Sequence, residues 1–105
     1  MTARTTHNPH GRTIGAGRTI VLHTTPTCQQ CTATKRFLDN RNVRYDVIDL
    51  TQDRDAHVFV TKLGYTSAPV IVIFNEDGEP VQDWSGFRPD LISAMFPLHA
   101  EAVQA

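Results

Sequence analysis

The two cysteines of the chain are separated by only two residues, and they stand where an apolar run gives way to a segment with helical periodicity. Residues 20–22 form a short apolar run, which favours a buried strand. In the segment after the cysteines, apolar residues recur at a spacing of three to four, which favours a helix. Cys28 and Cys31 therefore lie at a junction from strand to helix, and the fold is expected to contain a strand–helix unit there.

The start of this helix predicts the chemistry of the cysteines. Thr27 is a candidate N-cap and Gln30 completes a capping-box pattern, so Cys28 would occupy the first helical position. The positive end of the helix dipole and the unpaired N–H groups there favour a thiolate. Cys31, one turn further on, could then displace a group captured by Cys28. The spacing predicts dithiol–disulfide exchange, with Cys28 as nucleophile and Cys31 as resolving thiol.

Metal binding and inert thiols are the alternative interpretations of the cysteine pair. A structural zinc ion needs four ligands, and the sequence has neither a second cysteine pair nor a suitably spaced histidine pair. An iron–sulfur cluster would need ligands from a second chain or from glutathione. No metal is therefore expected, and a non-enzymatic module that holds zinc or a cluster remains the third hypothesis.

The remaining pattern predicts an α/β chain with the order β-α-β-α-β-β-α. Apolar residues on one helical face precede Gly64, with Asp53 or Asp55 as the cap, and Pro89 suits the first turn of a final helix. A strand–helix–strand crossover makes the first two strands parallel, and the turn at residues 75–78 makes the last two antiparallel. The expected result is a four-stranded mixed sheet flanked by helices. Beyond the first, the expected strands are residues 43–50, 70–74 and 81–84.

Length and composition favour one domain without a nucleic-acid or membrane partner. The 105 residues include 10 basic and 11 acidic side chains, so no strong field attracts nucleic acid. No stretch approaches the roughly 18 apolar residues of a membrane span. Two cysteines are too few for a disulfide scaffold, so a reducing cytoplasm is expected. We expect a monomer with a disordered tail at 1–17, for which a targeting peptide is the less favoured alternative, a domain at 18–98 and a short tail at 99–105.

Three segments, in order along the chain, resemble the NrdH-redoxins, which are glutaredoxin-like members of the thioredoxin superfamily. The resemblance covers roughly residues 18–98 and implies a thioredoxin fold. It also implies a redox carrier without a bound cofactor, reduced by thioredoxin reductase, whose substrate is the large subunit of class Ib ribonucleotide reductase. The host would be a bacterium, or a bacterium infected by a virus. The three segments are residues 28–36, 64–70 and 84–90.

The resemblance also implies which residues meet the partner. In the superfamily, the proline at the position of Pro69 is cis and faces the cysteines, which leaves the backbone at Ala68 free to pair with an incoming peptide. The segment that begins at Trp84 would form a platform beside the sulfur, although a core tryptophan and a solvated arginine are the plainer interpretation. The residues expected to contact the partner are Thr27, Gln29, Gln30, Ala68, Pro69, Trp84, Ser85, Gly86, Phe87, Arg88 and Asp90.

Several departures from glutaredoxins predict weak binding of glutathione. Thr25 stands where a basic residue is common, and residues 85–88 replace a Gly-Gly turn that acidic residues follow. Asp90 alone could keep part of the acidic role, so a charged tripeptide would lose its ion pairs. A glutathione-dependent glutaredoxin is the second hypothesis. His23 and His57 are expected to be packed or half-exposed rather than proton shuttles.

Overall fold

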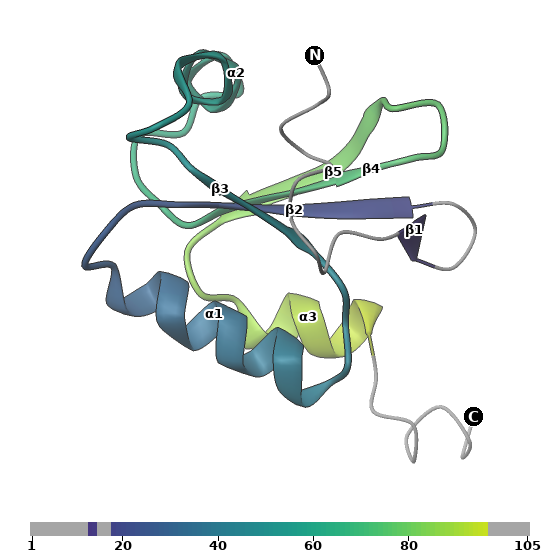
Figure 1. Ribbon diagram of the computed structural model, residues 1–105. Coiled ribbons are helices and arrows are strands. Elements are labelled where there is room, and N and C mark those ends of the chain that lie inside the picture. Colours follow the sequence, from purple (N-terminus) through teal and green to yellow (C-terminus); the bar gives the residue numbers. More distant parts are fainter. Residues whose placement is uncertain (1–12, 15–17, 97–105) are drawn as a thin grey trace, which may run out of the picture.

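The structure, a computed structural model, describes residues 13–14 and 18–96, which form a central sheet between helices (Figure 1). The strands are β1 (Thr13–Ile14), β2 (Arg18–Thr24), β3 (Asp46–Asp49), β4 (Val70–Phe74) and β5 (Pro80–Ser85). The helices are α1 (Gln29–Asn40), α2 (Arg54–Lys62) and α3 (Pro89–Met95).

The sheet has the predicted mixed topology. Strand β2 pairs in parallel with β3 and antiparallel with β4, and β4 pairs antiparallel with β5. This arrangement confirms the four-stranded mixed sheet of the thioredoxin fold. The short strand β1 pairs antiparallel with the start of β2 and adds a fifth strand to this sheet. The two residues of β1 belong to the segment expected to be disordered. The rest of that segment and the C-terminal tail lie outside the described residues, so the domain boundaries stay a prediction.

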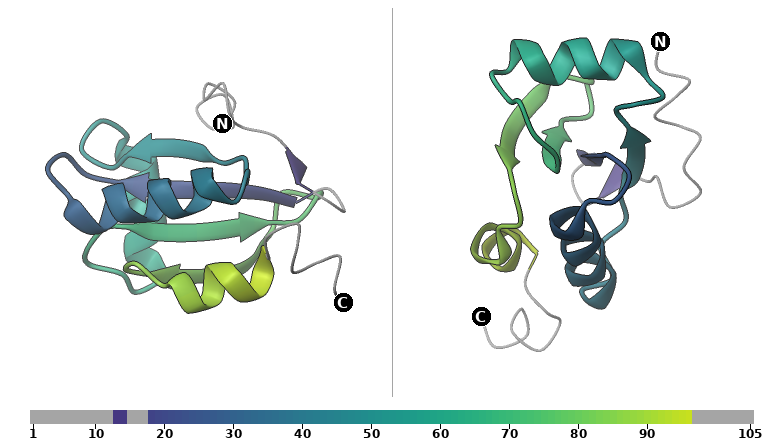
Figure 2. Two further views of the ribbon diagram at one scale, coloured as in Figure 1. Left: turned by 90° about the horizontal axis from the view of Figure 1, so that it is seen from below. Right: turned by 90° about the vertical axis from the view of Figure 1, so that its left-hand side faces the viewer.

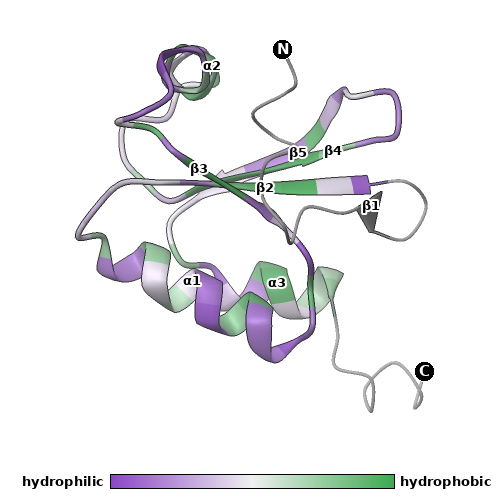
Figure 3. Ribbon diagram, in the orientation of Figure 1, coloured by the Kyte–Doolittle hydropathy of each residue, from purple (hydrophilic) through white to green (hydrophobic). Residues whose placement is uncertain are grey.

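The sheet is covered on both faces, and Figure 2 shows α1 and α3 on one face and α2 on the other. Because successive strand residues point to opposite faces, Ile20 and Leu22 join the core beneath α1 and α3, while Val21 joins the core beneath α2. Strand β4 is coloured as hydrophobic along its length (Figure 3), and its residues supply both cores. The strand predicted at residues 70–74 is confirmed with those bounds.

Local hydrogen bonds explain where the other elements differ from the prediction. The strand expected at residues 43–50 is reduced to β3, because the residues before it close the end of α1. The N–H of Val43 donates to the carbonyl of Leu38 at 3.0 Å, and the hydroxyl of Tyr45 donates to Asp39 at 2.8 Å. The predicted cap of α2 is confirmed, with the Asp53 carboxylate accepting from the N–H of Ala56 at 3.0 Å.

Three segments meet at the edge of the sheet where α1 begins. Strands β2 and β3 end there, with Thr24 beside Asp49, and antiparallel β4 starts there, with His23 beside Val70. The turn carrying Cys28 follows β2 directly. The topology therefore brings the cysteines, the end of β3 and the residues before Val70 to one edge.

Candidate functional site

Cys28 and Cys31 form a disulfide at the N-terminus of α1, with their Cα atoms 5.2 Å apart. Cys28, and not Thr27, is the N-cap, because its Sγ accepts a hydrogen bond from the N–H of Cys31 at 3.0 Å. Thr27 has a φ of 56° in the left-handed region and lies outside the helix. The predicted N-cap is therefore wrong by one residue, and Cys28 precedes the first helical position instead of occupying it.

The two sulfurs have unequal surroundings. Cys28 is partly exposed, whereas Cys31 is 2% exposed. A backbone N–H points at the Cys28 sulfur, and the sulfur lies at the positive end of the α1 dipole. After reduction, this environment favours a thiolate on Cys28.

The Gln30 side chain connects the cysteine motif to the segment after β5. Its Oε1 accepts a hydrogen bond from the N–H of Phe87 at 3.1 Å. Gly86 has a φ of 86°, and a Cβ at that position would meet this Oε1 at 3.3 Å. Gln29 and Thr27 are exposed beside the motif. Gln30 thus positions a loop that lies far from it in the sequence, a role that the capping-box interpretation missed.

The loop before β4 is held by the same segment. The Ala68–Pro69 bond is cis, as expected, and Pro69 is buried while Ala68 is partly exposed. The N–H of Gly86 donates to the carbonyl of Pro69 at 2.9 Å, and the hydroxyl of Ser85 donates to the carbonyl of Ser67 at 3.2 Å. Residues 85–87 therefore bind both the loop that carries Pro69 and, through Gln30, the cysteine motif.

The expected platform is only partly exposed to a partner. Trp84 is 5% exposed and packs in the core with α1 and α3, so its assignment as a contact residue is corrected to a core residue. Phe87 is half-buried and meets the ring of Phe37 edge-on, with centroids 5.8 Å apart. Arg88 and Asp90 are exposed and form an ion pair at 2.9 Å, which lowers the pKa of Asp90.

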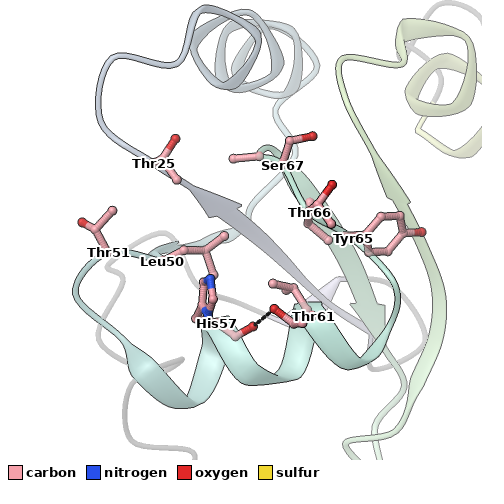
Figure 4. Close-up of a pocket in the computed structure, with 11 residues that line it drawn as sticks. Thr25, Leu50, Thr51, His57, Thr61, Tyr65, Thr66 and Ser67 are labelled. Atoms are coloured by element: carbon pink, nitrogen blue, oxygen red, sulfur yellow. Dashed lines mark hydrogen bonds between the residues drawn. The ribbon is translucent and has the colours of Figure 1, made fainter.

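A cavity of about 790 Å³ lies between α2 and the loop that carries Pro69 (Figure 4). Its polar lining consists of hydroxyl groups and one imidazole, and Figure 4 shows these side chains around one hollow. None of its described lining residues is Lys, Arg, Asp or Glu. Because Thr25 and Ala68 line it, the cavity opens beside the cysteine motif. The polar lining residues are Thr25, Thr51, His57, Thr61, Tyr65, Thr66 and Ser67.

A second hollow, of about 560 Å³, contains both cysteines in its lining, together with Lys35 and Asp49. The Asp49 carboxylate accepts hydrogen bonds from the N–H of Thr51 at 2.8 Å and from its hydroxyl at 2.6 Å. These bonds, with a smaller attraction from Lys35, lower the pKa of Asp49. The sequence prediction did not assign either charged residue. The spacing of Lys35, four residues after Cys31, was the available signal.

His23 and Asp46 are ionisable side chains whose burial shifts their pKa values. His23 is 2% exposed, and its Nδ1–H donates to the carbonyl of Val70 at 3.0 Å, so the expected packed histidine is confirmed. Burial lowers the pKa of His23. Asp46 is 3% exposed, and burial raises its pKa. His57 is exposed on α2, so the expectation that it is packed or half-exposed is wrong.

The described residues contain neither a metal-binding cluster nor a membrane-spanning helix. Within residues 13–14 and 18–96, no three His, Cys, Asp or Glu side chains are grouped so that they could hold a metal ion. In the same part of the chain, every helix is too short or too polar to cross a membrane.

Comparison with known proteins identifies the family. The glutaredoxin family model matches residues 20–79. The glutaredoxin-like protein NrdH of Escherichia coli K12 is 32% identical over 78 residues, which cover 74% of this chain and 89% of that protein. The gene 56 protein of Mycobacterium phage D29 is 36% identical over 81 residues, which cover 76% of this chain and 84% of that protein.

The fold of the chain also matches a solved structure of this family. The NrdH-redoxin of Escherichia coli superimposes with a TM-score of 0.64 at 32% identity, over 74% of this chain and 95% of that one. The matched region includes the cysteine pair, whose disulfide the structure contains. The chain therefore belongs to the glutaredoxin family, as an NrdH-redoxin, and is a thiol–disulfide oxidoreductase.

Proposed function

We propose that this protein is an electron donor to a protein disulfide, such as that of the large subunit of class Ib ribonucleotide reductase, and that thioredoxin reductase reduces it in turn. The observation that carries the proposal is the uncharged cavity beside the cysteine motif and the loop that carries Pro69. The Escherichia coli NrdH-redoxin, described as having a thioredoxin-like activity profile, supports the choice of reductant. We place the reaction in the cytoplasm of a bacterium or of a bacterial host of a phage, because the relatives come from both.

The proposed reaction begins with the reduced protein. The Cys28 thiolate attacks one sulfur of the partner disulfide, and the other partner sulfur leaves as a thiolate and takes up a proton. Cys31 then loses its proton and attacks the Cys28 sulfur of the mixed disulfide. The second partner thiolate leaves and is protonated, so the partner has gained two electrons from the protein, one proton from Cys31 and one proton from water. The protein is left with the Cys28–Cys31 disulfide.

A polypeptide fits the surroundings of the sulfur better than glutathione does. The partly exposed backbone at Ala68 offers hydrogen-bonding groups to an extended peptide, as in strand addition. The cavity that continues from it has hydroxyl groups, one imidazole and apolar side chains, and no Lys, Arg, Asp or Glu, among its described lining residues. The charges of glutathione would need charge-assisted partners. Of the two positions at which glutaredoxins often carry such charges, Asp90 is already paired with Arg88 and Thr25 supplies no positive charge.

A coupled assay tests the proposal against the glutathione alternative. The oxidised protein is offered NADPH with thioredoxin reductase, or NADPH with glutathione and glutathione reductase. We expect faster turnover with thioredoxin reductase, and faster turnover with glutathione would support the glutaredoxin hypothesis instead.

Two cysteine variants test the assigned roles within the same assay. Cys28→Ser should abolish reduction of the partner, whereas Cys31→Ser should accumulate a mixed disulfide between residue 28 and the partner. If Cys28→Ser accumulates the mixed disulfide instead, the two roles are reversed.

The proposal includes a monomer that works without a bound cofactor. Metal analysis of anaerobically purified protein, combined with its mass in solution, checks both points. One zinc ion or one cluster for each one or two chains would favour the metal-binding module.

A further inference from the structure

We propose that Lys35 and Asp49 form an opposed charge pair that tunes the ionisation of the reactive sulfur, with Lys35 favouring the thiolate and Asp49 opposing it. The inference rests on the thiol chemistry at Cys28. The starting observation is that both charged side chains line the same hollow as Cys28 and Cys31.

The position of Lys35 on α1 directs its charge towards the cysteines. Lys35 lies four residues after Cys31, so the two share one face of the helix. Helical side chains lean towards the N-terminus, which carries a long lysine side chain back along α1 in the direction of Cys28. Lys35 is half-buried, whereas the neighbouring Arg36 is exposed. An ammonium group at this place favours a negative sulfur.

Asp49 brings the opposite charge from the end of β3. It pairs in the sheet with Thr24, four residues before Cys28. Its two hydrogen bonds from Thr51 hold the carboxylate in place and favour its ionised form. A fixed carboxylate near the sulfurs raises the energy of a thiolate directly, and it also offsets the charge of Lys35.

No other charged side chain contributes to the described lining of this hollow. Apart from Lys35 and Asp49, the ionisable residues that line it are the two cysteines themselves. His57 of α2 lines the neighbouring uncharged cavity and not this one. The charge around the sulfurs is thus set by the N-terminus of α1, which every variant keeps, and by two side chains that can be changed separately.

The experiment titrates Cys28 alone, in reduced protein that carries Cys31→Ser, by the ultraviolet absorbance of the thiolate. Lys35→Gln should raise the midpoint by roughly half a pH unit, and Asp49→Asn should lower it. Asparagine retains the Oδ1 that accepts from Thr51, so Asp49→Asn removes mainly the charge. Arg36→Gln is the matched control, because it removes a positive charge from the same helix outside the hollow.

The direction of the shifts separates a charge effect from a loss of packing. Lys35→Arg should restore the midpoint, and added salt should shrink the difference caused by Lys35→Gln. Equal shifts for Lys35→Gln and Arg36→Gln, or shifts of the same sign for Lys35→Gln and Asp49→Asn, would overturn the inference. The titration uses no partner or reductase, so its result is independent of whether the proposed electron-donor role fails.

Discussion

The buried carboxylate of Asp46 is predicted to destabilise the fold at neutral pH, and Asp46→Asn should relieve this cost. Asp46 is 3% exposed, and its Oδ1 has no hydrogen-bond partner among the residues that the structure describes. It lies on β3 beside Val21, and Ile48 follows two residues later on the same face, beneath α2. Leaving a buried polar group unpaired costs about 1–3 kcal/mol. Asparagine keeps an unpaired oxygen but removes the buried charge, which costs more than a neutral polar group. We therefore expect Asp46→Asn to recover about 1 kcal/mol, or about 4–8 °C in Tm.

The pH dependence distinguishes the charge from the shape of this side chain. Burial raises the pKa of Asp46 above its ordinary value of 3.8, so the native state holds a proton that the unfolded chain has already lost. The native state therefore loses stability relative to the unfolded chain as pH rises above 3.8, until Asp46 is ionised in both states. The advantage of Asp46→Asn should be small below pH 3.8 and fully developed at neutral pH.

Urea unfolding at several pH values measures this effect. Glu79→Gln is the control, because it neutralises an exposed carboxylate and should change stability by less than about 0.5 kcal/mol. An Asp46→Asn protein that is no more stable than the wild type at neutral pH, or equally more stable at every pH, would refute the reasoning.

Three further predictions use the same unfolding measurements. Burial holds the pKa of His23 below 6.5, so the unfolded chain takes up this proton first on acidification; His23→Phe should lose less stability than the wild type as pH falls below 6.5. Gly86→Ala should destabilise by about 1–2 kcal/mol through its positive φ, and by more than Gly78→Ala, because only the first added methyl meets Gln30. Leu38→Ala, in the core beneath α1 and α3, should cost about 2–5 kcal/mol, and a much smaller loss would contradict its packing there.

Hydrophobic periodicity and turn residues predicted every element of the fold except the two-residue strand β1. The run at residues 70–74 is apolar throughout and rich in β-branched residues, and it forms β4 with those bounds. The strand expected at residues 43–50 was predicted too long because the hydrophobic pattern does not encode polar contacts. Val43 and Tyr45 alternate like strand residues, but their hydrogen bonds to Leu38 and Asp39 make them part of the closure of α1.

The candidate site was predictable where it depends on neighbouring residues, and less so where the fold brings distant residues together. The disulfide between Cys28 and Cys31 follows from their spacing. The N-cap was misplaced because a sulfur can accept the hydrogen bond that a Thr27 hydroxyl was expected to accept. The contact between Gln30 and Phe87, 57 residues apart, has no local signature in the sequence.

The charges in the hollow that contains both cysteines also depend on residues that the fold brings together. Helical periodicity alone does not distinguish the surroundings of Lys35 from those of Arg36. The parallel pairing of β2 with β3 brings Asp49 beside the turn that leads to the cysteines. Only that pairing reveals two charges of opposite sign around the sulfurs.

We expect Cys28 to ionise readily because its sulfur caps α1. Titration of the single thiol in the reduced Cys31→Ser protein, which keeps the backbone N–H that points at this sulfur, measures that ionisation. The midpoint should lie clearly below the value of about 8.5 for an ordinary cysteine. A midpoint at or above that value would contradict the assignment of Cys28 as the nucleophile.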